Sequence, residues 1–157
     1  MKNNLKFFFL MGALILFGMG QAQESKEASV QKLIASKNFV FKAQTVLPQR
    51  GSMRQLTSDY DLRLFGDSVV SFLPFFGRAY IAPIGSEEGG IKFTSTDFMY
   101  DVQKKKKGWD ITILPRDTRD VRQLFLSVSN NGYARLQVVS NNRDGIAYNG
   151  YIAAIKH

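Results

Sequence analysis

The chain contains no cysteine and only one histidine, His157, which is its last residue. Without cysteine there is no disulfide, no thiolate metal site, no cysteine nucleophile and no thiol to carry a lipid. Chain ends are usually poorly ordered, so His157 is a poor candidate for a fixed general base. Ser-His-Asp sites, Cys-His sites and ordinary zinc sites are therefore excluded. We predict a protein that is not an enzyme and holds neither a metal nor a cofactor.

Long hydrophobic runs are also scarce, and the one present lies near the start of the chain. Residues 7–19 (FFFLMGALILFGM) are apolar, but crossing a bilayer takes about 20 such residues. Lys2 and Lys6 precede the run, and Gly20-Gln21-Ala22 places small residues three and one positions before a cut. These features together are typical of a secretory signal. We predict a signal peptide over residues 1–22, cleavage near Ala22, no transmembrane span, and a periplasmic or secreted product.

The remaining residues divide into a short polar segment and one β domain. Residues 23–37 (QESKEASVQKLIASK) are rich in helix formers, and Ala28, Val30, Leu33, Ile34 and Ala35 follow roughly helical spacing. We predict a short helix or flexible lead-in that lies across the edge or end of the domain. Residues 38–157 contain no linker and suit a single core.

From Asn38 onward the apolar residues alternate with a period of two, which is typical of β-strands. Short turns and no further helices connect these runs, which favours an antiparallel meander of about nine strands. The meander could form a small barrel or a two-layer sandwich, and periodicity does not separate the two. Gly66-Asp67 and Asn131-Gly132 predict tight hairpin turns, the second of type I′. The predicted strands cover about 39–47, 59–65, 68–73, 78–82, 91–102, 109–114, 123–128, 133–139 and 146–155.

The formal net charge is +8, of which Lys2 and Lys6 would leave with the signal. An exported basic protein could meet lipopolysaccharide, anionic polysaccharide or an acidic partner, whereas nucleic acid is not expected there. The one run of like charge is Lys104 to Lys107, which we place at a hairpin tip. Its simplest interpretation is a solvated knob that discourages edge pairing, and the alternative is a contact with phosphate or acidic sugar.

Residues 72–80 (FLPFFGRAY), hereafter the aromatic segment, place four aromatic side chains in a connection between predicted strands. Such connections are normally polar and exposed. The apolar residues either plug the end of the core or form an exposed patch for an apolar or amphipathic ligand with an anionic head. Tyr133, Tyr148 and Tyr151 are further candidates for its rim. The predicted ligand-binding residues are Phe72, Leu73, Phe75, Phe76, Arg78 and Tyr80.

Weaker signals for chemistry have simpler explanations. Ser29 and Lys32 match a Ser-x-x-Lys spacing, but the other elements of that motif are missing. Glu87-Glu88 and the segment 140–145 (SNNRDG) are interpreted as solvated turns. A hydrolase based on carboxylates alone would need two aspartates to converge in a cleft. Its candidates are Asp59, Asp61, Asp97, Asp101 and Asp110.

Several short motifs link the chain to a known family. They are the stretch LPFFGRAY at 73–80, GGIKF at 89–93, Gly108-Trp109, NGYA at 131–134 and Tyr148-Asn149-Gly150. With these motifs the chain resembles a family of small exported proteins from Bacteroidetes-type bacteria, known only as a domain of unknown function. The resemblance covers roughly residues 39–152 and implies an exported single β domain, but no activity. Many relatives look like lipoproteins or periplasmic proteins, and this chain departs from the lipoprotein members because it lacks the cysteine.

Two functional hypotheses follow. The first is a noncatalytic exported envelope protein that binds an apolar or amphipathic ligand, or a protein partner, through the aromatic segment. The second is a structural or accessory subunit of a cell-envelope assembly that pairs through exposed strand edges.

Overall fold

The structure, a computed structural model, describes residues 26–80 and 89–155. Within them, a helix over residues 26–36 precedes nine strands. The predicted signal peptide, Glu87-Glu88 and His157 lie outside these described ranges. No helix in the described ranges is long and apolar enough to pass through a membrane. The strands are β1 (Asn38–Pro48), β2 (Arg54–Phe65), β3 (Ser68–Leu73), β4 (Ile91–Ser95), β5 (Phe98–Lys105), β6 (Gly108–Pro115), β7 (Val121–Ser129), β8 (Tyr133–Ser140) and β9 (Ile146–Ala153).

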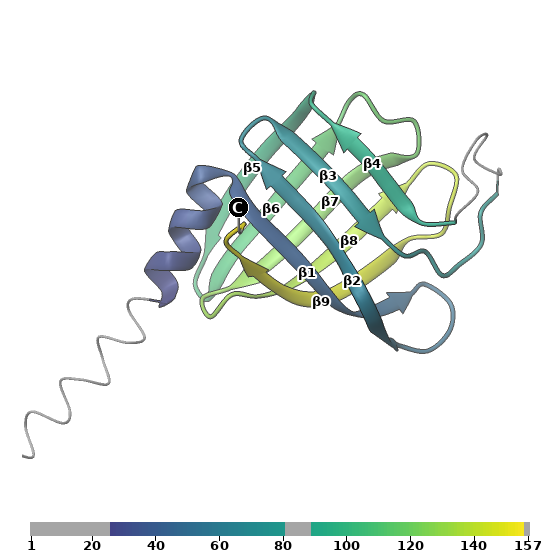
Figure 1. Cartoon of the computed structure of the whole chain (residues 1–157), viewed down its shortest axis with the longest axis horizontal. Helices are drawn as coiled ribbons and strands as arrows, with labels where there is room; N and C mark the ends of the chain where they lie inside the picture. Colours follow the sequence, from purple (N-terminus) through teal and green to yellow (C-terminus); the bar gives the residue numbers. More distant parts are fainter. Residues whose placement is uncertain (1–25, 81–88, 156–157) are drawn as a thin grey trace, which may run out of the picture.

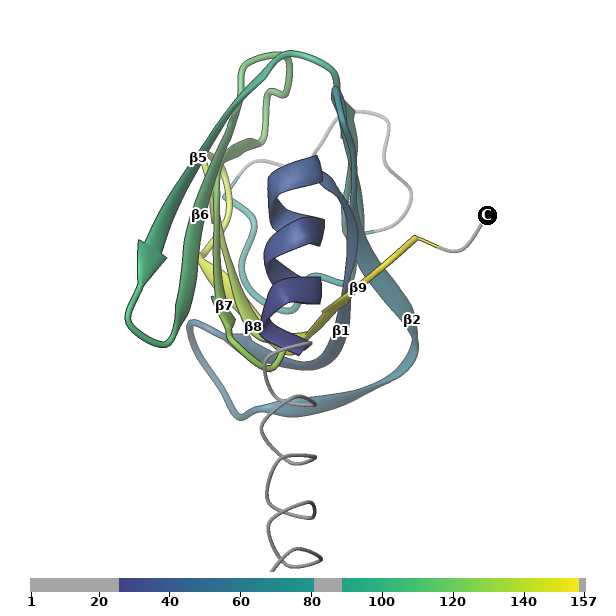
Figure 2. The ribbon, with the colours of Figure 1, turned by 90° about the vertical axis from the view of Figure 1, so that its left-hand side faces the viewer.

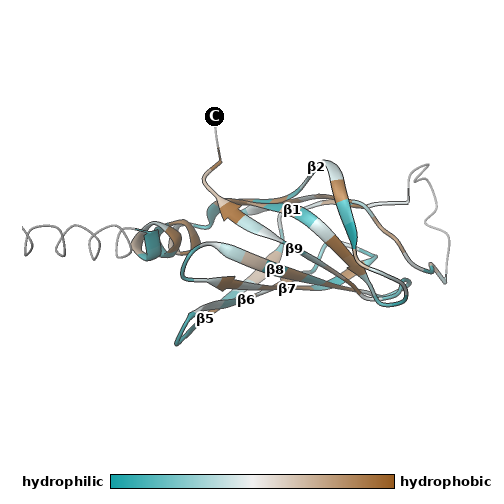
Figure 3. Ribbon diagram, turned by 90° about the horizontal axis from the view of Figure 1, so that it is seen from below, coloured by the Kyte–Doolittle hydropathy of each residue, from teal (hydrophilic) through white to brown (hydrophobic). Residues whose placement is uncertain are grey.

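The strands form one antiparallel sheet that curls into a nearly closed barrel (Figure 1). Their order is β4-β3-β2-β1-β9-β8-β7-β6-β5, so β1 pairs with both β2 and β9. The two edge strands, β4 and β5, follow each other in the chain without pairing to each other. Seen from below, β1 and β2 face β5 to β8 across the interior (Figure 3). The predicted antiparallel meander is confirmed. Of the two forms that the sequence left open, a small barrel or a two-layer sandwich, the structure shows the barrel.

Two predicted strands differ from the observed ones. The single strand expected over residues 91–102 is interrupted at Thr96-Asp97, where the chain turns from β4 into β5. The strand expected at residues 78–82 is not formed over 78–80, where Ala79 makes only an isolated bridge to Arg143. Residues 81 and 82 are outside the described part of the chain. Alternation alone did not reveal the turn, because Ser95, Thr96 and Asp97 are polar residues that also occur in strands.

Asp117, in the loop between β6 and β7, stabilises this turn. Its carboxylate accepts hydrogen bonds from the Ser95 hydroxyl and from the backbone N–H groups of Thr96 (2.8 Å) and Asp97 (3.2 Å). Hydrogen bonds to the charged form of a carboxyl group favour that form. They lower the pKa of Asp117 to about 2. The loop thereby holds the two edges of the open seam together at one end.

The barrel interior is filled by side chains. Alternate residues of each strand point inward, as in Trp109, Ile111 and Ile113 of β6, and all three are buried. The largest fully buried side chains include Tyr148, Phe39 and Phe41. Close packing of this kind is typical of small barrels, whose interiors are just wide enough for side chains.

The N-terminal helix lies across one open end of the barrel (Figure 2). Val30 and Ile34, one turn apart, are buried against the core, whereas the predicted stripe residues Ala28 and Ala35 are exposed. The Tyr100 hydroxyl of β5 donates a hydrogen bond to the Ile34 carbonyl at 3.0 Å. Burial raises the pKa of Tyr100 above its ordinary value. The predicted place of the helix, at the end of the domain, agrees with this arrangement.

The predicted hairpin tips are present, with one correction. Gly66-Asp67 joins β2 to β3, and Lys106-Lys107 joins β5 to β6. The β7–β8 loop is not a two-residue type I′ turn, because it contains three residues, 130–132, and only Gly132 has a positive φ, 87°. The Gly132 N–H donates to the Ser129 carbonyl at 2.9 Å, which fits a three-residue hairpin loop with glycine last.

Candidate functional site

The aromatic segment leaves β3 at the end of the barrel opposite the helix (Figure 1). Leu73 is fully buried, and Phe75 and Phe76 are half-buried against the core. The buried Tyr148 hydroxyl donates a hydrogen bond to the Pro74 carbonyl at 2.6 Å. These three apolar side chains therefore close the end of the core.

Arginine side chains cover the half-buried rings of the segment. The Arg143 guanidinium lies 5.2 Å from the centroid of the Phe75 ring, and that of Arg54 lies 5.0 Å from Phe76. Both distances fall within the usual range of cation–π contacts. Arg143 is itself buried, donates a hydrogen bond to the Gly90 carbonyl at 3.0 Å and pairs with Asp120 at 3.0 Å. It thus connects the aromatic segment to the start of β4 and to the β6–β7 loop.

Phe72 differs from these rings because it faces solvent. Its side chain is 44% exposed, stacks on Tyr60 with ring centroids 5.7 Å apart, and carries the Lys92 ammonium 4.8 Å from its centroid. The strand pairing places Lys42, Asp61, Phe72 and Lys92 in one row across β1 to β4. Lys42 and Arg63 pair with Asp61 at 3.1 and 3.0 Å. This row, with Tyr60 and Arg63, is hereafter the Phe72 face.

Arg78 and Tyr80, the other exposed members of the segment, lie beside the β8–β9 loop. The Tyr80 N–H donates to the Asn142 carbonyl at 2.8 Å, and the Asp144 N–H donates to the Arg78 carbonyl at 3.0 Å. The Tyr80 hydroxyl donates to the Asp144 carboxylate. This bond raises the pKa of Tyr80 and lowers that of Asp144. Three of the six predicted residues therefore form a core plug, and the other three, Phe72, Arg78 and Tyr80, are exposed.

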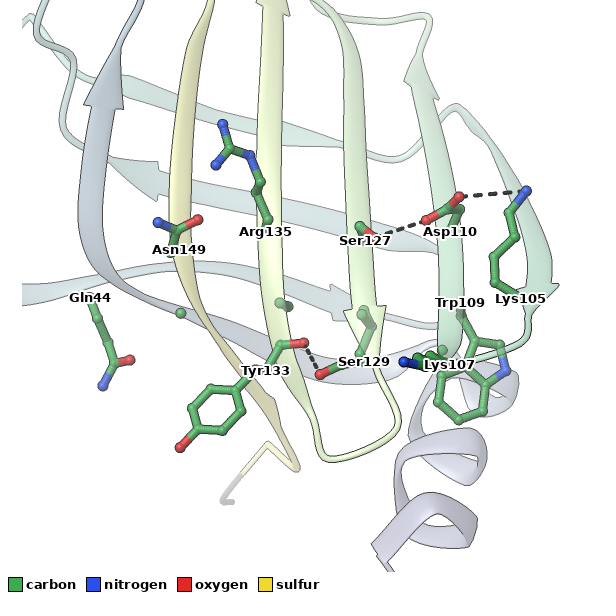
Figure 4. A pocket seen from close by; sticks show the side chains of 14 residues that line it. Gln44, Lys105, Lys107, Trp109, Asp110, Ser127, Ser129, Tyr133, Arg135 and Asn149 are labelled. Carbon is green, nitrogen blue, oxygen red and sulfur yellow. Dashed lines mark hydrogen bonds and ion pairs between the residues drawn. The ribbon is translucent and has the colours of Figure 1, made fainter. Parts of the chain in front are cut away.

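A separate groove of about 570 Å³ lies outside the barrel over β6 to β9 (Figure 4). Lys105 pairs with Asp110 at 3.7 Å, and the Ser127 hydroxyl donates to the same carboxylate at 2.9 Å. Tyr133 and Arg135 extend from β8 into its lining. A second hollow, of about 350 Å³, also contains Arg135 and continues toward Gln137 and Val139.

Two of the tyrosines expected beside the aromatic segment lie elsewhere. Tyr133 and Tyr151 pair with each other on β8 and β9, next to the turn that approaches Val30 of the helix. Tyr148 does reach the segment, but from inside the barrel. Burial raises the pKa of Tyr148 above its ordinary value.

The aspartates that a carboxylate hydrolase would need do not share a cleft. Asp59 and Asp61 lie on β2, and Asp97 lies in the β4–β5 turn, where it pairs with Arg116 at 3.7 Å. Asp101 and Asp110 lie on β5 and β6, and Asp110 is paired with Lys105. This placement gives no support to the hydrolase hypothesis.

Sequence reasoning missed Arg143 and the groove. Arg143 lies among turn residues, Asn141, Asn142, Asp144 and Gly145, which normally indicate exposure. The groove draws residues from strands far apart in the chain, so no local motif marks it. The signal available in advance was the outward phase of Tyr133, Arg135 and Gln137 on β8, opposite the buried Ala134 and Leu136.

Comparison with known proteins identifies the family. The family described as "Domain of unknown function (DUF4251)" matches residues 21–152, nearly the whole chain. The chain belongs to this family. The resemblance drawn from the sequence motifs is thereby confirmed at the level of the family.

Among solved structures, a DUF4251 family protein from Bacteroides eggerthii DSM 20697 has the same fold. The TM-score is 0.59 at 18% sequence identity, over 85% of this chain and 88% of the other. No curated protein matches this chain. At this identity the comparison supports the fold alone. The function of the DUF4251 domain has to be argued from its candidate sites.

Proposed function

We propose that the protein is a noncatalytic exported envelope protein that binds an amphipathic ligand with an anionic head through the Phe72 face. The observation that supports this most directly is the exposed Phe72 ring with the Lys92 ammonium beside it. The ring offers an apolar surface for the tail of a ligand. Lys92, Lys42 and Arg63 surround it with positive charge, of which Asp61 balances one unit.

The ligand binds outside the barrel in this proposal. Packed side chains fill the interior, and the plug formed by Leu73, Phe75 and Phe76 closes the end beside Phe72. Export rests on the signal features of residues 1–22. Anionic lipid headgroups are plentiful at envelope membranes and attract basic surfaces by about 1 kcal/mol per nearby cation.

A second candidate function is supported by the open seam. β4 and β5 each have a neighbour on one side only. Unpaired strand edges can accept a further strand from a partner protein. An accessory subunit of an envelope assembly would use these edges rather than the Phe72 face.

The test compares sedimentation of the protein purified from its cell envelope with vesicles of phosphatidylglycerol and of phosphatidylcholine. We expect binding to the anionic vesicles, and we expect Phe72→Ser to weaken it about tenfold. Phe65→Ser is the matched control, because Phe65, the last residue of β2, is 36% exposed but lies outside the Phe72 face. Equal binding to both vesicles, or no effect of Phe72→Ser, contradicts the proposal.

Native mass spectrometry of the same preparation separates the two candidates. A bound small molecule that is lost in Phe72→Ser supports the ligand-binding function. A stoichiometric second polypeptide, with no small molecule, supports pairing through β4 or β5 instead.

A further inference from the structure

The groove on the outside of β6 to β9 is not used by the proposed function. In the strand order it lies beyond β1, on the opposite side from β3 and Phe72 (Figure 1). Arg135 lines both this groove and the hollow that continues it toward Gln137 and Val139. From Tyr133 to Val139 on β8 the combined length is about 20 Å, at the usual rise per strand residue. The shape suits an extended ligand.

The charge of this groove is positive and partly unpaired. Among the described residues that line it, Asp110 is the one carboxylate, and Lys105 and Ser127 already contact it. The side chains of Lys107 and Arg135 form no hydrogen bond or ion pair with any described residue. Two cations are therefore left to meet a negative ligand. An arginine fork of this kind matches the geometry of a carboxylate.

The other groups in the lining suit a ligand rich in hydroxyls. Side-chain amides of Gln44 and Asn149 offer donors and acceptors, and the hydroxyl groups of Ser127 and Ser129, which already donate within the protein, offer acceptors. Tyr133 is 63% exposed at the rim, and its ring face can pack against the C–H face of a sugar ring.

Gln44 is brought to this lining by a local irregularity of β1. It has no register partner on either β2 or β9, because both pairings shift between Ala43 and Thr45. Bulges of this kind re-aim a side chain and are frequent beside binding sites. The position of this bulge is therefore consistent with Gln44 contacting a ligand in the groove.

We propose that this groove binds an acidic oligosaccharide, with Arg135 and Lys107 holding its carboxylate or sulfate groups and Tyr133 supporting a sugar ring. A single-stranded nucleic acid fits less well, because such sites present several stacking aromatics and many phosphate contacts. Here one exposed aromatic ring and two unpaired cations are present among the lining residues.

The test is calorimetric titration of the purified protein with oligogalacturonate, and with maltooligosaccharide of equal length as the neutral probe. We expect oligogalacturonate to bind, with an affinity that falls as salt is raised, and the neutral sugar to bind much more weakly. Arg135→Gln with Lys107→Gln should raise the Kd about tenfold or more, because each removes a charged hydrogen bond. Tyr133→Ser should weaken both sugars by a similar factor, since ring packing does not depend on ligand charge.

Matched controls are available close to the groove. Lys106→Gln removes the same charge from the same hairpin turn, and Arg122→Gln does so on β7, but neither residue lines the groove. Both should leave the Kd unchanged, and so should Phe72→Ser, which separates this site from the proposed function. Circular dichroism of every variant confirms that the fold is retained.

Three results overturn the proposal. One is the absence of binding by oligogalacturonate and by a sulfated oligosaccharide of the same length. Another is equal weakening by Lys106→Gln and by the Arg135 and Lys107 changes, which would indicate general charge attraction. The third is tighter binding of single-stranded oligonucleotides in the same titration, which would assign the groove to nucleic acid.

Discussion

Tyr148 of β9 reaches through the barrel interior and donates a hydrogen bond to the carbonyl oxygen of Pro74, 2.6 Å away. The Tyr148 ring is fully buried, and Pro74 is the first residue after β3. The bond ties the aromatic segment to a strand 74 residues further along the chain. It thereby helps to direct Phe75 and Phe76 into the end of the core, while Phe72 stays on the outer face of β3.

Removing this hydroxyl should destabilise the protein. In Tyr148→Phe the ring still fills its place, but the buried Pro74 carbonyl loses its donor, which costs about 1–3 kcal/mol. Denaturation in urea measures the loss. The control is Tyr151→Phe, because the Tyr151 hydroxyl has no partner among the described residues and its side chain is 39% exposed. That change should stay within about 0.5 kcal/mol. Equal effects of both changes would contradict the role given to Tyr148.

The same buried tyrosine predicts a loss of stability in alkali. An unfolded chain releases a tyrosine proton near pH 10, whereas burial raises the pKa of Tyr148 in the folded protein. Above pH 10 the unfolded state therefore holds fewer protons than the folded state. The titration of Tyr148 then lowers the free energy of unfolding by about 1.4 kcal/mol per pH unit. Urea denaturation between pH 8 and pH 11 should show a shallower decline for Tyr148→Phe than for the unchanged protein. Parallel curves would show that Tyr148 titrates alike in both states.

Asp117 predicts a loss of stability in acid. Its folded pKa is lowered to about 2 by hydrogen bonds from Ser95, Thr96 and Asp97, so the unfolded chain takes up a proton first as the pH falls below about 4. The stability that Asp117 supplies is full above that value and is lost between about pH 4 and pH 2. We expect Asp117→Asn to reduce stability at pH 7 and to flatten this part of the curve. Asp101→Asn, on exposed β5, serves as the control. A curve unchanged by Asp117→Asn would argue against the seam closure described above.

The strands of this barrel were largely predictable because the alternation of apolar and polar residues along each strand shows which side chains are buried. In β6, Trp109, Ile111 and Ile113 alternate with half-buried Asp110 and Thr112, and the period of two is visible without any knowledge of neighbours. The turn at Thr96-Asp97 could not be predicted in this way, because Asp117, which stabilises it, comes 20 residues after Asp97. Closure of the barrel depends on β1 meeting β9, and a pairing so distant in the chain leaves no local pattern.

The candidate sites show the same difference between features marked by a local sequence pattern and features that depend on contacts distant in the chain. The aromatic segment was visible because unusual residues follow one another, although the sequence could not tell which rings are plugs and which are exposed. Arg143 looked like an exposed turn residue, and its burial follows from contacts with Phe75, Gly90 and Asp120, which come from three other regions. The groove joins Gln44 to Arg135 across β9, and this requires the strand order, which alternation does not contain.

Gly150 of β9 should tolerate no side chain, since β1 passes so close to it. A Cβ atom there would lie 1.8 Å from the Lys42 carbonyl oxygen, a backbone atom that cannot move without disturbing the β1–β9 pairing. We expect Gly150→Ala to destabilise the protein by about 3 kcal/mol or more, as overpacking against backbone does. Gly145→Ala is the matched control, because its Cβ would meet nothing nearer than 3.7 Å. Urea denaturation of both variants measures the difference. If Gly150→Ala were as stable as Gly145→Ala, β1 would have to lie farther from β9 than described, and the bulge that aims Gln44 into the groove would not be held in place.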